Sequence, residues 1–158
     1  MLKVHMLIGI QGSGKTTYSK ILSKKEGIPI VSTDGIRDED PTLEGMDVFT
    51  LAFDRVAGYL KEGKSVIYDA TNVTPLVRGR FFTGLQERGI EKDSYEVVAH
   101  YFTPNLELSL ARVIKRNNIP GERFLPLDIV ESYSKNIIKP TLEEGFSEIV
   151  TIDNYMVY

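Results

Sequence analysis

The amino-acid sequence predicts an α/β protein in which a parallel sheet of five strands is covered by helices on both faces. Five short apolar segments rich in β-branched residues alternate with five segments of helical periodicity, the pattern from which parallel sheets are built. A glycine-rich turn joins the first apolar segment to the first helical one. No repeat, low-complexity tract or linker interrupts the chain, so we expect a single domain over residues 1–158.

Each element has its own local signal. The helix predicted over Lys15–Lys24 has Tyr18, Ile21 and Leu22 on one face, and the segment from Val48 to Leu60 keeps helical spacing as well. Proline at the first helical turn marks the start of three further helices, at 75, 104 and 126. The strands are expected at Val4–Ile8, Ile28–Ser32, Ser65–Tyr68, Tyr95–Phe102 and Glu148–Ile152.

The turn after the first strand matches the phosphate-loop pattern G-x-x-x-x-G-K-[ST] at every defined position, from Gly9 to Thr16. We expect its three glycines to take positive φ and to bring consecutive N–H groups close to a β-phosphate, next to the positive end of the following helix. Lys15 is expected between the β- and γ-phosphates, and the Thr16 hydroxyl is expected to complete the coordination of Mg²⁺. The turn therefore predicts binding of a nucleoside triphosphate.

Acidic side chains follow two of the predicted strands. Asp34 and Arg37 leave the second strand three residues apart, so one helical turn would point both toward the same pocket. There Asp34 could accept a proton from an attacking hydroxyl; a helix cap is the alternative. Asp69 ends the third strand, where it could contact Mg²⁺ through water, orient the substrate or Lys15, or cap the next helix. Ala70 stands where motor ATPases carry a catalytic Glu, which disfavours rapid hydrolysis.

Arginines gather in the second half of the chain. Arg78 lies one turn into the helix after the third strand and could face a substrate phosphate. Arg112 and Arg116 share a helix face, and a polar stretch carrying Arg123 follows them. A mobile loop with arginines at this place is what a lid over ATP needs, because it supplies positive charge and excludes water.

Composition restricts the partners. The net charge is −3, and six acids with no Lys or Arg stand between residues 38 and 54, so no basic field is available for non-specific binding of nucleic acid. His5 and His100 both fall in strands, and we interpret them as packing or edge residues. With no cysteine, no leader and no apolar run long enough to span a bilayer, we expect a soluble cytoplasmic protein that does not enter a membrane.

Over nearly its whole length, the chain resembles the kinase domain of the polynucleotide 5′-hydroxyl kinase family within the P-loop kinases. The likeness is carried by Gly12-Ser13-Gly14-Lys15-Thr16-Thr17, Ser32-Thr33-Asp34-Gly35-Ile36-Arg37, Asp69-Ala70-Thr71-Asn72 with Pro75 and Arg78, and then Arg112, Arg116-Asn117 and Arg123 before Leu125-Pro126. It implies a three-layer P-loop fold with sheet order 2-3-1-4-5 and a small lid at about residues 116–126. It also implies ATP as the nucleotide.

The resemblance assigns roles to individual residues. Asp34 would be the general base, assisted in catalysis by Lys15 and Arg123. Arg37 would contact the phosphate of the acceptor, in a site shaped by Asp69, Thr71, Asn72 and Arg78. ATP would be bound by residues 12–17 with Arg112, Arg116 and Arg123, and Mg²⁺ by Thr16 and Asp69.

We therefore expect an ATP-dependent phosphotransferase that acts on an acceptor hydroxyl, foremost the 5′-hydroxyl of a polynucleotide. Related kinases of small molecules share these motifs, so a small metabolite or nucleoside is an alternative acceptor. A protein from another class, an ATP-switched binding protein with little hydrolysis, is a further alternative. The oligomeric state does not follow from the sequence.

Overall fold

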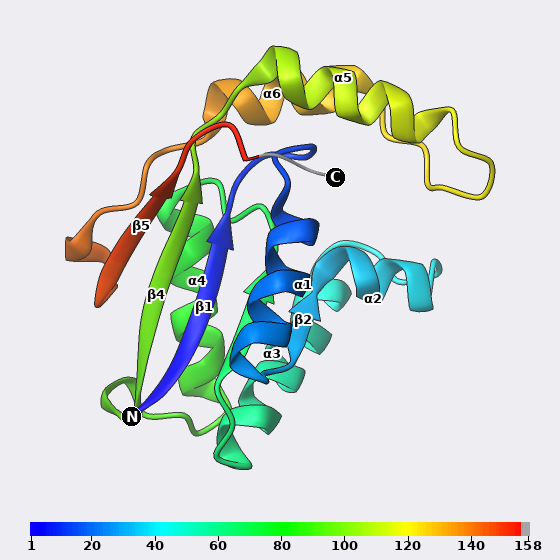
Figure 1. Cartoon of the computed structure of the whole chain (residues 1–158). Coiled ribbons are helices and arrows are strands. Elements are labelled where there is room, and N and C mark those ends of the chain that lie inside the picture. Colours follow the sequence, from blue (N-terminus) through cyan, green and yellow to red (C-terminus); the bar gives the residue numbers. More distant parts are fainter. Residues whose placement is uncertain (156–158) are drawn as a thin grey trace.

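The structure is a computed structural model that describes residues 1–155 and confirms the predicted α/β architecture. Five parallel strands form one sheet in the order β2-β3-β1-β4-β5 (Figure 1). The strands are β1 (Leu2–Ile8), β2 (Ile30–Ser32), β3 (Val66–Asp69), β4 (Tyr95–Phe102) and β5 (Glu148–Ile152). Strand β2 starts two residues later than expected, after Pro29, whose ring nitrogen has no hydrogen to donate to a neighbouring strand.

Residues 1–155 contain six α-helices, one more than the five predicted segments, because the residues after β2 form a separate short helix. The helices are α1 (Lys15–Glu26), α2 (Thr33–Glu39), α3 (Met46–Lys61), α4 (Pro75–Glu87), α5 (Leu106–Asn117) and α6 (Leu127–Asn136). Two 3₁₀ turns, η1 (Lys92–Ser94) and η2 (Leu142–Glu144), complete the described chain. None of these helices is long and apolar enough to cross a bilayer.

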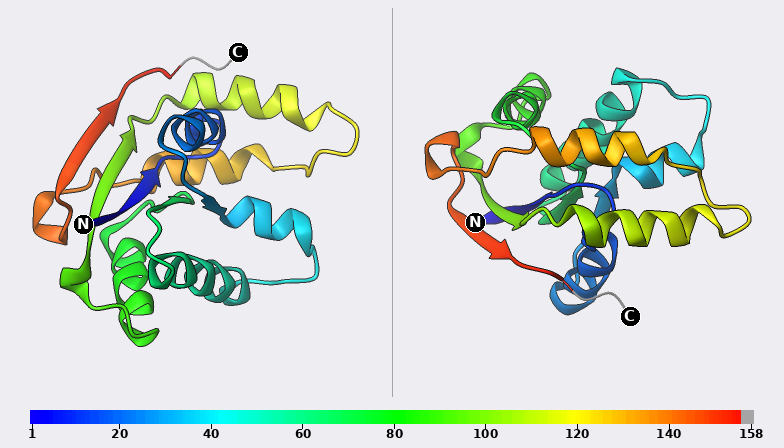
Figure 2. Two further views of the ribbon diagram at one scale, coloured as in Figure 1. Left: turned by 60° about the horizontal axis from the view of Figure 1, so that its bottom comes forward. Right: turned by 90° about the horizontal axis from the view of Figure 1, so that it is seen from above.

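The alternation of side chains along β1 divides the core between the two faces of the sheet. Val4, Met6 and Ile8 are buried in the cluster that contains the apolar faces of α3 and α4. Leu7 points to the opposite face, where Tyr18 of α1 packs against its cluster. Figure 2 shows α1 on one side of the sheet and α3 with α4 on the other. The three-layer arrangement follows from this period of two.

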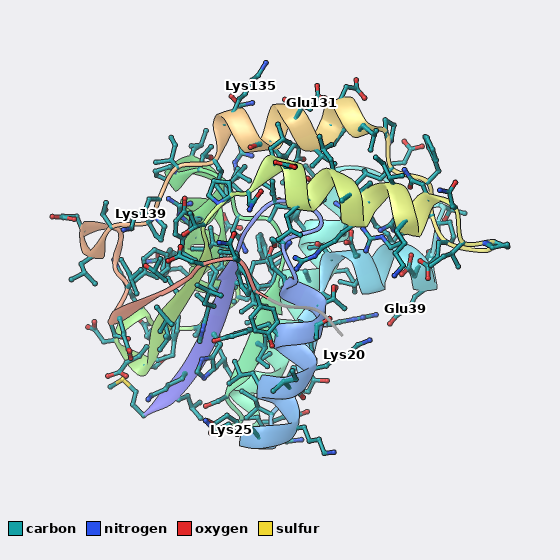
Figure 3. The ribbon with its side chains drawn as sticks, turned by 45° about the horizontal axis from the view of Figure 1, so that its top comes forward. Lys20, Lys25, Glu39, Glu131, Lys135 and Lys139 are labelled. Carbon is teal, nitrogen blue, oxygen red and sulfur yellow. The ribbon has the colours of Figure 1, made fainter. Side chains whose placement is uncertain are left out.

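Helices α5 and α6 form an antiparallel pair across the carboxyl end of the sheet (Figure 2). Val113 of α5 and Val130 of α6 are buried together with Ile10, the second residue of the phosphate loop. Charged side chains such as Lys20 of α1 and Lys135 of α6 point outward from the ribbon (Figure 3). The loop joining α5 to α6 extends beyond the sheet on the side of α2 (Figure 1).

Candidate active site

The phosphate loop occupies residues 9–14, between β1 and α1. Gly12 and Gly14 have φ angles of 75° and 96°, in the left-handed region that favours glycine. A Cβ on Gly12 would also lie 2.7 Å from the Ser109 carbonyl oxygen. Gly9 is not among the residues with positive φ, so that expectation was wrong. Gly9 is required for space instead, since its Cβ would lie 2.9 Å from Ser13 Oγ.

Side chains of the loop are placed for an anion. Lys15 Nζ donates to the Ile10 carbonyl oxygen at 3.1 Å, which folds the lysine back over the loop. The Ser13 hydroxyl is buried without a hydrogen-bond partner. Thr16 and Thr17 lie in the first turn of α1, and Thr16 is exposed. A loop with an unpaired hydroxyl, a lysine and a helix N-terminus fits the phosphates of a nucleotide.

Lys15 and Asp69 form the electrostatic centre of the site. Asp69 is the last residue of β3 and only 6% exposed, and the β2–β3 register places it level with Ser32. Burial raises the pKa of Asp69, while the positive charge of Lys15 opposes that shift and the charge of Asp34 adds to it. Burial lowers the pKa of Lys15, and the charges of Asp69 and Asp34 oppose this. The fold therefore gathers one cation and two carboxylates from three separate segments.

Helix α2 presents Asp34 and Arg37 together, as their spacing predicted. Arg37 Nη1 donates to Asp34 Oδ1 at 3.0 Å, and the Arg37 guanidinium lies 6.0 Å from the centre of the Phe49 ring. Ser32 caps the helix by accepting from the Gly35 N–H, so Asp34 is not used as the cap. Asp34 remains 56% exposed in its side chain and can meet a ligand.

The lid runs through residues 118–126, between α5 and α6, and its arginine contacts α2. Arg123 Nη2 lies 3.1 Å from Asp34 Oδ1, and Arg123 Nη1 donates to Asp38 Oδ1 at 3.1 Å. The Asn117 side chain closes the loop by donating to the Leu125 carbonyl and accepting from the Leu125 N–H. The predicted lid therefore contacts, through Arg123, the residue that we expected to act as the base.

The two arginines of α5 lie on the phosphate-loop side of the molecule. Arg112 Nη1 donates to the Gly12 carbonyl oxygen at 3.1 Å, and its Nη2 donates to the Tyr155 carbonyl oxygen. The positive charge of Arg116 contributes to the lowered pKa of Lys15, which places Arg116 within electrostatic reach of the loop. Both positions suit contacts with a polyphosphate tail.

Residues after β3 that we expected at the acceptor site make structural contacts within the protein. Thr71 accepts from the Gly9 N–H through its carbonyl at 3.0 Å. The buried Asn72 has a φ of 48°, and its side-chain amide donates to the Leu7 and Ala70 carbonyls. Arg78 is 0% exposed and paired with Glu144. This burial turns the Arg78 guanidinium away from any acceptor phosphate, so we do not place it in the acceptor site.

Sequence reasoning missed two residues of this region. Asp38 was counted only among the six acids between residues 38 and 54, yet it binds the arginine of the loop between α5 and α6. Its position four residues after Asp34, on the same helix face, was the available signal. Phe49 was not singled out from the sequence, yet it packs beneath the Arg37 guanidinium. Nothing in the local sequence links those two positions.

The residues present fit a magnesium ion bound with a nucleotide. Mg²⁺ prefers oxygen ligands and is held in such sites by one or two protein groups together with phosphates and waters. Thr16 offers an exposed hydroxyl at the start of α1, and Asp69 offers a carboxylate whose charge interacts with that of the adjacent Lys15. Among residues 1–155 no cluster of three His, Asp or Glu side chains forms a protein-only metal site. The donor set therefore matches a metal shared with a nucleotide.

Solved structures with the same fold include kinases of different substrates. A fungal RNA kinase matches with a TM-score of 0.70 at 16% identity, over 99% of this chain and 76% of that one. A sugar kinase from Janibacter sp. HTCC2649 matches with a TM-score of 0.68 at 16% identity, over 97% and 86%. A chain of the Pnkp1/Rnl/Hen1 RNA repair complex matches with a TM-score of 0.66 at 22% identity, over 85% and 43%. No curated protein matches the sequence.

The chain thus has the fold of these solved kinases together with a phosphate loop. The model of the AAA domain family matches residues 4–139, and the chain belongs to that family.

Proposed function

We propose that this P-loop kinase transfers the γ-phosphoryl group of ATP to an acceptor hydroxyl, with Asp34 as the general base. The observation that carries the proposal is the convergence of Asp34, Asp69 and Lys15 at the carboxyl end of the sheet, beneath a lid arginine. Such an arrangement supplies positioning and charge, which are the main requirements of phosphoryl transfer.

Each group then has a defined task. The Asp34 carboxylate would accept the proton of the acceptor hydroxyl and orient the oxygen for in-line attack. Lys15, Arg116 and Arg123 would neutralise charge on the transferring group, with Arg112 on the phosphate tail of ATP. Thr16 and Asp69 would hold Mg²⁺, which, when bound, bridges phosphate oxygens and offsets their charge.

The acceptor that we propose is the 5′-hydroxyl of a polynucleotide. Arg37, which lies 3.0 Å from Asp34, would contact a phosphate adjoining the reacting hydroxyl, as the likeness to polynucleotide 5′-hydroxyl kinases implies. Thr71 and Asn72 would shape this site through the backbone conformation of the segment after β3. The likeness to a fungal RNA kinase supports this choice.

A small molecule with a free hydroxyl, such as a metabolite or nucleoside, is the second candidate. Acidic side chains favour it, because Asp38, Glu39 and Asp40 surround the outer end of α2 and would repel a polyanion. The burial of Arg78 removes one of the two cations expected beside an acceptor phosphate. The likeness to a sugar kinase supports this alternative.

The test of the base is a comparison of Asp34→Asn with Asp38→Asn. Both residues contact Arg123 at 3.1 Å, so the pair separates loss of the lid contact from loss of the base. We expect Asp34→Asn to bind a fluorescent ATP analogue within a few-fold of wild type and to lose roughly 10²- to 10⁴-fold in turnover. Asp38→Asn should retain most of its turnover. Turnover of Asp34→Asn within a few-fold of wild type would refute the assignment.

Transfer of the labelled phosphate from γ-labelled ATP distinguishes between the candidate acceptors. Oligonucleotides with a 5′-hydroxyl, matched oligonucleotides that already carry a 5′-phosphate, and a panel of sugars and nucleosides would be compared. Labelling of only the 5′-hydroxyl strands supports the first candidate, and labelling of a small molecule supports the second. Binding of ATP with no transfer to any acceptor would instead favour an ATP-switched binding protein.

A further inference from the structure

Arg78 has a position that neither the phosphate loop nor the lid explains. It lies in the first turn of α4 and is the largest fully buried side chain among residues 1–155. Its Nε and Nη2 donate to the two carboxylate oxygens of Glu144 at 2.7 and 3.1 Å. Its Nη1 donates to the carbonyl oxygens of Asn72 at 2.8 Å and Ile138 at 3.0 Å. One guanidinium therefore joins three separate segments.

The first of these segments carries site residues. Asn72 closes the stretch that begins with Asp69, and its side chain donates to the Leu7 carbonyl of β1 at 2.8 Å. Thr71 accepts from the N–H of Gly9, the first residue of the phosphate loop, at 3.0 Å. The Asn72 backbone has a φ of 48°, in the left-handed region that asparagine enters more readily than most non-glycine residues. Arg78 binds the carbonyl of that residue.

The other two segments follow α6, at the end of that helix opposite the lid loop. Ile138 follows the end of α6, the helix that returns from the lid, and its N–H donates to the Val73 carbonyl at 2.7 Å. Glu144 also accepts from the Thr141 N–H at 2.9 Å, within the capping box of η2. The strand-end segment and the chain that follows α6 are thus held by the same side chain.

The chemistry of the contact requires arginine. A planar guanidinium can donate to a carboxylate with two parallel bonds and still reach two carbonyls, whereas lysine has three donors at a single point. Removing a buried charge leaves its carboxylate partner unpaired, and a displacement of about 1 Å at a reacting centre can lower the rate about 10²-fold. A buried arginine beside a site can therefore affect turnover without touching a substrate.

We propose that Arg78 is a positioning residue for phosphoryl transfer, which holds the Asp69–Asn72 segment against the phosphate loop and joins it to the chain that follows α6. The inference rests on the proposed function, because it assumes that Asp69 must be placed relative to Lys15 for transfer. Arg78 acts through Asn72 and Glu144 and does not contact ATP or the acceptor.

The experiment compares Arg78→Met, Arg78→Lys and Glu144→Gln with the control Arg88→Met. Arg88 makes the same kinds of contact, with the Asp54 carboxylate at 2.7 Å and the Gly84 and Thr50 carbonyls, but they join α3 and α4 away from the site. Two measurements are needed: kcat and KM for ATP, and amide hydrogen exchange at Gly9 and Ile138. Those two N–H groups bond to Thr71 and Val73 and report the position of the segment directly.

We expect Arg78→Met to lose about 10²-fold in kcat with KM for ATP changed less than about threefold, because Lys15 and the loop amides stay on β1 and α1. Gly9 and Ile138 should exchange faster, and Arg78→Lys should recover part of both losses. Arg88→Met should leave kcat and both amides unchanged. If Arg78→Met does not fold, Glu144→Gln should show the same changes to a smaller degree.

Two results would overturn the inference. The first is unchanged exchange at Gly9 and Ile138 in a folded Arg78→Met or Glu144→Gln protein. The second is a loss of kcat in Arg88→Met that equals the loss in Arg78→Met, which would indicate general destabilisation. If the wild type transfers phosphate to no acceptor, the proposed function fails, whereas the exchange measurement still decides whether Arg78 holds the segment.

Discussion

Two neighbouring strands of the sheet carry histidines whose side chains contact each other. His100 of β4 is 5% exposed and lies between the Tyr18 hydroxyl, 2.7 Å from its Nδ1, and His5 Nδ1, 2.9 Å from its Nε2. Burial, together with the neighbouring His5, lowers the pKa of His100 from 6.5 to about 4. Burial also lowers the pKa of His5, with Glu26 and Glu148 opposing the shift. Both imidazoles are therefore neutral in the native state at pH 7.

Because both histidines are buried and neutral, we predict that the free energy of unfolding decreases in mild acid. Between pH 6.5 and 4 the unfolded chain binds a proton at residue 100 that the native protein does not bind. The contribution is fully present above pH 6.5 and is lost as the pH falls toward 4, by up to about 3 kcal/mol for His100 alone. Urea unfolding of wild type and His100→Gln from pH 7.5 to 4.5 measures it. Parallel profiles for the two proteins would contradict the prediction.

Elements are held together by close packing that single glycines permit. Helix α4 carries Gly84 against α3, where an added Cβ would lie 2.6 Å from Phe53 Cδ2. The Phe53 ring packs edge-on against the rings of Tyr68 and Phe81, so a shift of the ring would disturb both contacts. Gly79 lies on the same helix, and an added Cβ there would meet nothing within 4 Å. Substitution by alanine at these two glycines of α4 should therefore have opposite effects on the free energy of unfolding.

We expect Gly84→Ala to lower the free energy of unfolding by about 1–3 kcal/mol, because the extra methyl group overpacks the α3–α4 contact. Gly79→Ala should raise it by about 0.4–1 kcal/mol, since alanine reduces the entropy of the unfolded chain and favours the helix. Denaturant unfolding of both variants provides the measurement. A stabilised Gly84→Ala protein would show that α3 and α4 are packed less closely than the structure indicates.

The lid is an element whose contact with α2 should matter more for rate than for stability. Arg123 is 47% exposed, and its partners Asp34 and Asp38 are 56% and 66% exposed. Ion pairs at such exposed positions contribute at most about 1 kcal/mol and weaken with salt. These ion pairs therefore contribute little to the free energy of unfolding.

We predict that Arg123→Ala changes the free energy of unfolding by less than about 1 kcal/mol and lowers kcat by roughly 10³- to 10⁵-fold, the range for loss of an arginine that acts on the transferring phosphoryl group. Parallel unfolding and steady-state assays check both numbers. Full turnover in this variant would exclude Arg123 from the catalytic set and leave its contact with Asp34 as a resting arrangement of the lid.

At the scale of the whole molecule, ligand binding should stabilise the fold through the phosphate loop. Burial lowers the pKa of Lys15, and the negative charge of nucleotide phosphates beside it would oppose that shift. A nucleotide at 100 times its Kd adds about 2.7 kcal/mol, which corresponds to about 5–10 °C in Tm for a chain of this length. Wild type should show that increase with ATP and Mg²⁺.

Lys15→Ala should lose most of that increase in Tm and all detectable transfer, while its Tm without nucleotide stays close to that of wild type. The reason is that the lysine contributes charge to the bound phosphates and only one hydrogen bond, to Ile10, to the free protein. Differential scanning calorimetry at several ATP concentrations makes the comparison. An undiminished increase in the variant would mean that the nucleotide binds elsewhere.

Much of the fold and part of the candidate site could be predicted from the sequence, because their signals lie within short segments. The phosphate loop is a run of eight residues, and the strands and helices arise from apolar periodicities of two and 3.6 within short segments. The pairing of Asp34 with Arg37 likewise depends on a spacing of three within one helix. Such features require no knowledge of what lies across the sheet.

The tertiary structure alone decided the contacts between distant segments. Arg78 meets Glu144 across 66 positions of sequence, and Arg123 meets Asp38 across 85. An arginine has the same local pattern whether it faces a substrate or a buried carboxylate, so Arg78 was expected at the acceptor and was found in the core. Whether such an arginine faces a substrate or the core depends on the residue that folding brings next to it. The packing of the whole chain determines that residue.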